Sequence, residues 1–219
     1  MQDLPTLPIW FEVVWMTINC GFGAAIARSR DTPVFGTLFA GVLVGLGGGM
    51  VRDVLLGLEP VAISTWYYLP AGAVGAVCGA LLYDRVVAWP PPLLLLHGIT
   101  LGFLVTIGTQ KAIAYDAPWF SAMALGVVTA SFGGMVADVM TAHRAVLASQ
   151  AHWVASALCV GAMIFWVIDE LMMRVDPGNP TAGLWIAVLP TVAVVATLRL
   201  ASVIRNWPSP SWPGEVAAG

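Results

Sequence analysis

The sequence predicts an all-α membrane protein with seven transmembrane helices, arranged as two inverted three-helix repeats plus a seventh helix. Three observations support this fold class: an apolar composition, seven long apolar runs, and an internal repeat. Of the 219 residues, 59% are hydrophobic and only 10% are charged, and the mean hydropathy is +0.86. Because about a quarter of the residues of a soluble domain are charged, water is not expected to be the main solvent of this chain.

Seven apolar runs are long enough to cross about 30 Å of hydrocarbon at about 1.5 Å per residue. Prolines, glycines and charged residues separate the runs, and tryptophans and tyrosines cluster beside the breaks, as in the interfacial belts of membrane proteins. The three cysteines lie inside apolar runs and lack the spacing of a zinc site or a disulfide framework. The predicted spans cover residues 10–27, 34–57, 66–83, 93–113, 119–141, 152–172 and 183–203.

The loop charges predict the orientation of the chain. Seven spans put the two termini on opposite sides, and the side of the C-terminus carries more arginine than the other side. By the positive-inside rule, the N-terminus is expected outside and the C-terminus in the cytoplasm. The basic residues on the predicted cytoplasmic side are Arg28, Arg30, Arg85, Arg144, Arg199 and Arg205, against Lys111 and Arg174, with Arg52, on the other.

An internal repeat with an offset of 85 residues organises the spans. Between residues 23 and 54, 13 of 32 positions are identical to those 85 residues later, including the run Gly-Gly-Met-Val-x-Asp-Val. Each copy holds three spans, and this odd number makes the second copy enter the membrane from the opposite face. We therefore expect a first repeat over 1–88, an inverted second repeat over 89–175, a seventh helix over 176–206 and a proline-rich cytoplasmic tail over 207–219.

Glycine clusters interrupt the second and fifth spans at matching places. Consecutive glycines cost about 1 kcal/mol each in helix propensity, and loosened backbone is tolerated in lipid only where protein or water covers it. The pair predicts two bent or interrupted helices whose backbone lines a polar path. The alternative is that these glycines only allow close helix packing, and that nearby hydroxyls bond to their own helix. The candidate pore or hinge residues are Gly47, Gly48, Gly49, Thr129, Ser131, Gly133 and Gly134.

Charged residues inside the apolar runs give a second signal, since each costs several kcal/mol unless it is paired or hydrated. Asp53 and Asp138 follow the two glycine clusters at the same offset and are expected at opposite mouths of one path, where they would attract cations. Arg52 precedes Asp53. Lys111 ends the fourth span near the expected level of Asp53, where it can pair with an acid, block a cation or respond to voltage. The alternative is that these charges pair locally or reach the interface as helix anchors.

The stretch from Gly47 to Pro60, Gly-Gly-Gly-Met-Val-Arg-Asp-Val-Leu-Leu-Gly-Leu-Glu-Pro, resembles the bacterial branch of the trimeric intracellular cation (TRIC) channel family. The similarity extends over roughly residues 10–203. It implies a homotrimer in the bacterial plasma (inner) membrane, with a potassium-permeable pore in each protomer between the kinked second and fifth helices. It also implies that Lys111 takes part in gating. The second motif departs from the first at Phe132, Ala137 and Ala145.

These observations predict a passive monovalent-cation channel with one pore per protomer. The alternative is a secondary transporter of a small zwitterion such as glycine, because inverted repeats serve carriers equally well and some members of the broad family are classed as glycine transporters. An enzyme is not expected, since His97, His143 and His152 lie on separate segments without a nucleophile or metal-ligand cluster. The expected partners are membrane lipid and two further copies of the chain, with no nucleic acid and no cofactor or metal other than the permeant cation.

Overall fold

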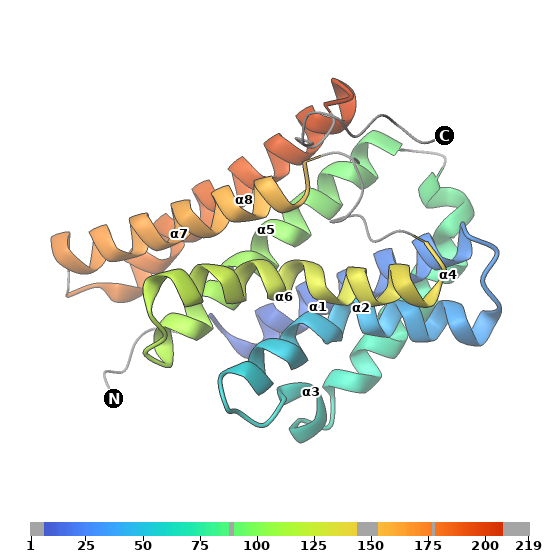
Figure 1. Ribbon diagram of the computed structural model, residues 1–219, viewed down its shortest axis with the longest axis horizontal. Coiled ribbons are helices and arrows are strands. Elements are labelled where there is room, and N and C mark those ends of the chain that lie inside the picture. Colours follow the sequence, from blue (N-terminus) through green and yellow to red (C-terminus); the bar gives the residue numbers. More distant parts are fainter. Residues whose placement is uncertain (1–6, 88–89, 144–152, 177, 208–219) are drawn as a thin grey trace, which may run out of the picture.

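The computed structural model describes residues 7–87, 90–143, 153–176 and 178–207, and every regular element in these ranges is a helix (Figure 1). The all-α prediction is confirmed. A single short helix that the sequence did not predict, α3 (Val61–Ser64), follows the second long helix. The long helices are α1 (Ile9–Arg28), α2 (Val34–Leu55), α4 (Tyr68–Val87), α5 (Pro90–Ala114), α6 (Trp119–Met140), α7 (Ala155–Val175) and α8 (Pro180–Ile204).

Each long helix occupies one of the seven predicted apolar runs. The predicted count of seven membrane spans is not confirmed, because fewer helices have the length and apolarity that a membrane span requires. Within the described ranges, five helices are long and apolar enough to cross a membrane, namely α1, α2, α6, α7 and α8. The other two helices carry polar residues: Asp84 and Arg85 lie in the last turn of α4, and α5 contains His97, Gln110 and Lys111. The predicted tail from residue 208 on, and the predicted repeat boundary at 88–89, lie outside the described residues.

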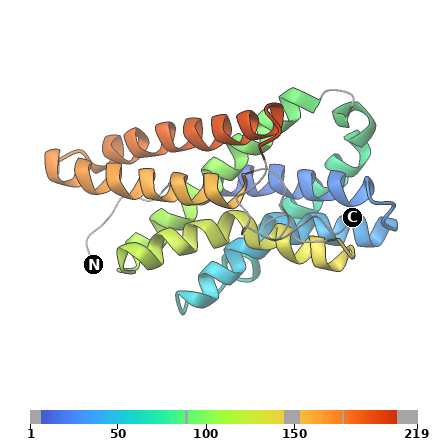
Figure 2. The ribbon, with the colours of Figure 1, turned by 45° about the horizontal axis from the view of Figure 1, so that its top comes forward.

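The helices form two groups that meet along α2 and α6. In the first group α1 packs against α2 and α4, and in the second group α5 packs against α6 and α8, with α7 alongside α8 (Figures 1 and 2). Apolar residues fill the interior of each group, with Met16 and Leu46 in the first and Val105, Leu158 and Phe165 in the second. Other large apolar side chains point outward, as expected where lipid replaces water as the solvent.

The ends of α1 and α5 have the same backbone geometry at the 85-residue offset. Each helix is followed by an aspartate in the left-handed conformation, Asp31 with φ 55° and Asp116 with φ 58°. Aspartate tolerates this conformation better than most side chains do. Two residues later, Pro33 and Pro118 form the N-caps of α2 and α6. The sequence identities at these positions therefore correspond to one repeated turn.

The ends of α2 and α6 match in the same way. The Asp53 carbonyl accepts a hydrogen bond of 2.8 Å from the N–H five residues on, and the Asp138 carbonyl accepts an equivalent bond of 2.9 Å. Each turn contains one residue in the left-handed region, Gly57 with φ 71° and Ala142 with φ 57°. Glycine is the favoured residue in this cap, so the second copy holds the same turn with a less suitable residue.

Candidate functional site

The crossing of α2 and α6 brings Gly48 and Gly133 into contact with the backbone of the facing helix. A Cβ on Gly48 would overlap the carbonyl oxygen of Thr129, and one on Gly133 would lie 2.6 Å from the carbonyl oxygen of Val44. The contacts run from 44 to 133 and from 48 to 129, so residue numbers rise along one helix as they fall along the other. The two helices therefore cross in antiparallel directions. Gly48 and Gly133 allow close packing of the two helices, as the alternative interpretation expected.

The neighbouring pair, Gly49 and Gly134, faces open space instead. Among the described residues, a Cβ on Gly134 would meet no atom within 4 Å, and one on Gly49 would meet only Arg52 Nη2, at 3.8 Å. Gly47 lies at the crossing, where its Cβ would be 3.2 Å from Gly133 Cα. Both clusters remain α-helical throughout, so the helices are not interrupted there, and the bent form stays a prediction. The glycines give close helix contact and open space without loss of the intrahelical hydrogen bonds.

A group of four charges, of which Arg52 and Asp53 are buried and Glu12 and Lys111 partly buried, occupies one end of the crossing, here called the Asp53 end. Arg52 is 1% exposed, and it lies between Asp53, at 2.8 Å from Nε to Oδ1, and Glu12, at 3.1 Å from Nη2 to Oε1. Lys111 Nζ lies 2.9 Å from Asp53 Oδ1. The second Asp53 oxygen accepts a hydrogen bond from the N–H of Val61, which begins α3. The carboxylate of Asp53 thus joins α2, α3 and α5.

Asp138 lies at the opposite end, here called the Asp138 end, and its partner also comes from the other helix group. Arg30 Nη1 lies 2.7 Å from Asp138 Oδ1 and donates a further hydrogen bond of 2.8 Å to the hydroxyl of Thr141. Arg30 follows the end of α1, just as Lys111 lies near the end of α5. Each acid at the end of α2 or α6 therefore pairs with a basic residue at the end of the first helix of the other group.

The two candidate hydroxyls bond to their own helix. Thr129 donates to the carbonyl of Leu125 and Ser131 to that of Val127, each at 2.6 Å. The backbone of Thr129 faces Gly48 at the crossing, whereas Ser131 borders an open cavity. Their polarity is largely satisfied within α6, as the alternative interpretation expected.

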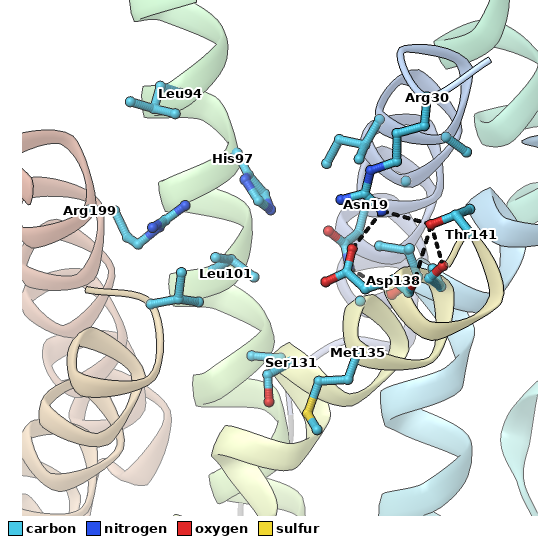
Figure 3. Close-up of a pocket in the computed structure, with 18 residues that line it drawn as sticks. Asn19, Arg30, Leu94, His97, Leu101, Ser131, Met135, Asp138, Thr141 and Arg199 are labelled. Atoms are coloured by element: carbon cyan, nitrogen blue, oxygen red, sulfur yellow. Dashed lines mark hydrogen bonds and ion pairs between the residues drawn. The ribbon is translucent and has the colours of Figure 1, made fainter. Parts of the chain in front are cut away.

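Two cavities approach the crossing from its two ends. The larger, of about 290 Å³, lies at the Asp138 end between α1, α5, α6 and α8, with Ser131 and Gly134 in its wall (Figure 3). The smaller, of about 20 Å³, lies at the Asp53 end beside Gly49 and Arg52. Thr129 borders the smaller cavity and its neighbour Ala130 the larger, so the crossing separates them. The described structure is closed at this point.

Three charged residues of the site were not identified from the sequence as partners. Glu12 is not among the sequence-predicted site residues, and Arg30 was counted only with the loop charges. Arg199 was counted with the loop charges, but it lies within α8 and is 8% exposed. The 85-residue offset pairs Lys111 with Ile26 and Arg30 with Tyr115, so the repeat alone did not indicate Arg30 as a counterpart of Lys111.

The sequence profile of the family described as glycine transporter matches residues 9–84 and 94–170. Among curated proteins, the UPF0126 inner membrane protein YadS of Escherichia coli K12 is 29% identical over 165 residues, which cover 72% of this chain and 77% of YadS. The UPF0126 membrane protein YvgT of Bacillus subtilis is 26% identical over 202 residues, which cover 86% of this chain and 88% of YvgT.

The fold is similar to those of solved cation channels. A structure described as showing the basis for conductance through TRIC cation channels has a TM-score of 0.80 and 20% identity, covering 95% of this chain and 98% of that one. The TRIC orthologue from Rhodobacter sphaeroides has a TM-score of 0.75 and 24% identity, covering 90% and 97%. The predicted resemblance is thus confirmed for the fold. Because the family profile matches well over half of its length, the chain belongs to the glycine transporter family, and this membrane protein has the fold of the TRIC channels.

Proposed function

We propose that this protein is a passive monovalent-cation channel, permeable to potassium, with one pore per protomer along the crossing of α2 and α6. The observation that carries the proposal is the pair of cavities that approach this crossing from opposite ends, each with an aspartate beside it. Release of Lys111 from Asp53 and of Arg30 from Asp138 is expected to leave a carboxylate at each mouth, where it would raise the local cation concentration. The cation-channel descriptions of the structural neighbours support the same function.

We further propose the architecture that the repeat predicts, with inverted repeats over 1–88 and 89–175 and a seventh helix over 176–206. The antiparallel crossing and the matched helix ends support it. The proposed assembly is a homotrimer in the bacterial inner membrane, with the N-terminus outside and the C-terminus in the cytoplasm. The description of the Rhodobacter sphaeroides neighbour as trimeric supports the oligomeric state, and YadS is named as an inner membrane protein. We propose no catalytic role.

Reconstitution tests the channel directly. Purified protein in a planar bilayer with asymmetric KCl is expected to give unitary currents whose reversal potential has the sign of cation selectivity. Replacement of KCl by NaCl on one side measures the preference between the two cations. Failure to observe cation-selective current at any voltage would refute the proposed function.

Gly134→Leu is expected to block conduction while the protein stays folded. The added side chain meets no atom within 4 Å of its Cβ, and it enters the cavity at the Asp138 end. Met135→Leu is the matched control, because Met135 also borders this cavity and the exchange conserves volume. Single-channel recording measures the effect, and gel filtration tests the fold. Wild-type conductance in a well-folded Gly134→Leu protein would place the pore elsewhere.

Lys111→Gln is expected to weaken the voltage dependence of opening and to raise the open probability. The ammonium group holds Asp53 at 2.9 Å, and a mobile charge couples to voltage with about 2.3 kcal/mol per 100 mV when it crosses the whole field. Arg174→Gln is the control, because Arg174 is exposed and pairs only within α7, with Glu170. The measurement is open probability against voltage. An unchanged curve for Lys111→Gln argues against a gating role.

The second candidate is a carrier for a small zwitterion such as glycine. The closed crossing between two unequal cavities favours it, because a carrier exposes its binding site to one side at a time. The description of the matched family supports the same candidate. Saturable uptake of radiolabelled glycine into proteoliposomes, without unitary currents, would select the carrier over the channel.

A further inference from the structure

Arg199 is a buried cation in the wall of the larger cavity, and none of the described residues supplies it with an acidic partner. The residue is 8% exposed, and its Nε atom has no hydrogen-bond partner within the described part of the chain. None of the ion pairs or side-chain hydrogen bonds of the described residues includes its guanidinium group. The helix is fixed at this point, because Gly98 of α5 lies close enough that an added Cβ would contact the Arg199 Cβ at 3.5 Å. A buried charge left unpaired costs several kcal/mol, so a compensating anion is expected.

The other charges of the cavity do not supply that anion. Asp138 lies on the opposite wall and is paired with Arg30 at 2.7 Å (Figure 3). His97 lies on the same side as Arg199, on α5, with its ring 4.9 Å from that of Phe22. With Asp138 paired to Arg30, the guanidinium of Arg199 is a surplus positive charge in the wall of a cavity of about 290 Å³.

The facing wall of the cavity contains a buried hydrogen-bond acceptor. Asn19 is 2% exposed, and its amide nitrogen donates a hydrogen bond of 2.9 Å to the carbonyl of Val44. Its Oδ1 atom has no hydrogen-bond partner among the residues that the structure describes. Buried polar atoms are nearly always satisfied by protein, water or ligand. The cavity wall thus includes a cationic donor on α8 and a neutral acceptor on α1.

We propose that this cavity binds a small organic acid, with its carboxylate on Arg199 and a hydroxyl or ammonium group of the same molecule donating to Asn19. The planar guanidinium matches a carboxylate in shape and charge, and its fork geometry allows two parallel hydrogen bonds. The surrounding wall is mostly apolar, which strengthens this ion pair relative to one in water. The site goes beyond the proposed conduction path, because binding at Arg199 does not require that ions cross the α2–α6 crossing.

Thermal unfolding of the purified full-length protein in detergent tests the site. The probes are acetate, glycolate and glycine at millimolar concentrations, with methylammonium chloride and sodium chloride as controls at equal ionic strength. A ligand that binds only the folded state raises the Tm in a saturable way. We expect glycolate or glycine to raise the Tm at lower concentrations than acetate does, and the two control salts to have no saturable effect. Comparison of the Tm increases with glycolate and with glycine shows whether the site prefers a hydroxy acid or an amino acid.

The variants assign the two contacts. Arg199→Met is expected to weaken carboxylate binding by at least about tenfold, whereas Arg199→Lys keeps a weaker response. Arg205→Met serves as the matched control, because Arg205 is an exposed residue that follows the same helix. Without ligand, Arg199→Met is expected to have a Tm no lower than that of the wild type, since it removes an unpaired buried charge. If Arg199→Met does not fold, the increase in Tm that the ligand gives in Arg199→Lys tests the proposal instead.

Asn19→Leu is expected to remove the preference for glycolate or glycine over acetate and to leave acetate binding intact. Three results would overturn the proposal: no saturable carboxylate effect in the wild type, an unchanged effect in the Arg199 variants, or an effect of inorganic phosphate alone. Since the measurement contains no current, the site can fail while the channel conducts, and the channel can fail while the site binds.

Discussion

Asp53→Asn is expected to destabilise the folded protein by about 3–5 kcal/mol, because it leaves the buried Arg52 and the partly buried Lys111 with Glu12 as the one acid paired to them among the described residues. Asp53 is 1% exposed and accepts contacts from both cations and from the N–H of Val61. For a chain of this size, such a loss lowers the Tm by about 10 °C. Thermal unfolding in detergent measures the change.

Asp84→Asn is the control for this charge effect. Asp84 pairs with Arg28 at 2.8 Å, but its side chain is 73% exposed. A surface ion pair contributes about 0–1 kcal/mol, so the Tm should change little. An equal decrease in Tm in the two variants would mean that the four charges at the Asp53 end are hydrated and do not stabilise one another.

Gly48→Ala is expected to separate α2 from α6 and to prevent formation of the folded bundle. The new methyl group would overlap the carbonyl oxygen of Thr129, which belongs to a helix backbone and cannot move as a side chain does. Overpacking of this kind costs about 1–3 kcal/mol where side chains can adjust, and more where backbone must move. The expected result is a loss of folded protein in gel filtration.

Gly134→Ala is the matched control for the crossing. It adds the same methyl group to α6, where no atom lies within 4 Å, and alanine favours the helix by up to about 1 kcal/mol. This variant should be at least as stable as the wild type. A folded Gly48→Ala protein with the wild-type Tm would show that the crossing in solution is looser than the described geometry.

The sequence predicted the positions of the long helices because each apolar run is bounded by residues with a clear physical preference. Pro33 and Pro118 start helices, and Asp31 and Asp116 occupy left-handed turns, so these boundaries are local properties of the chain. Hydropathy was less informative for α5, where Lys111 and its polar neighbours lie inside the bundle. Their polarity is compensated by tertiary contacts such as the pair with Asp53.

The candidate site was predictable in composition but not in pairing. The matched glycine clusters identified the crossing, yet only the structure separates Gly48, which packs on backbone, from Gly49, which faces a cavity. Adjacent helix positions differ by about 100° in direction, and the sequence does not state which direction meets the partner helix. Arg199 was misplaced for a related reason. A basic residue near the end of an apolar run is equally compatible with an interface and with a buried cavity.

The antiparallel crossing has a consequence for how such a chain can arise. The contact of Gly48 with Thr129 and that of Gly133 with Val44 are related by the 85-residue offset, as expected for the proposed inverted repeat. A separate three-helix polypeptide would form the same pair of contacts with a second copy inserted in the opposite orientation. Joining the copies in one gene fixes the orientation of each copy. It also allows a residue to be substituted in one copy without the same substitution in the other. The second copy has Phe132 at the position equivalent to Gly47 and Ala137 at the position equivalent to Arg52. An antiparallel homodimer would have to accept each such change in both subunits at once.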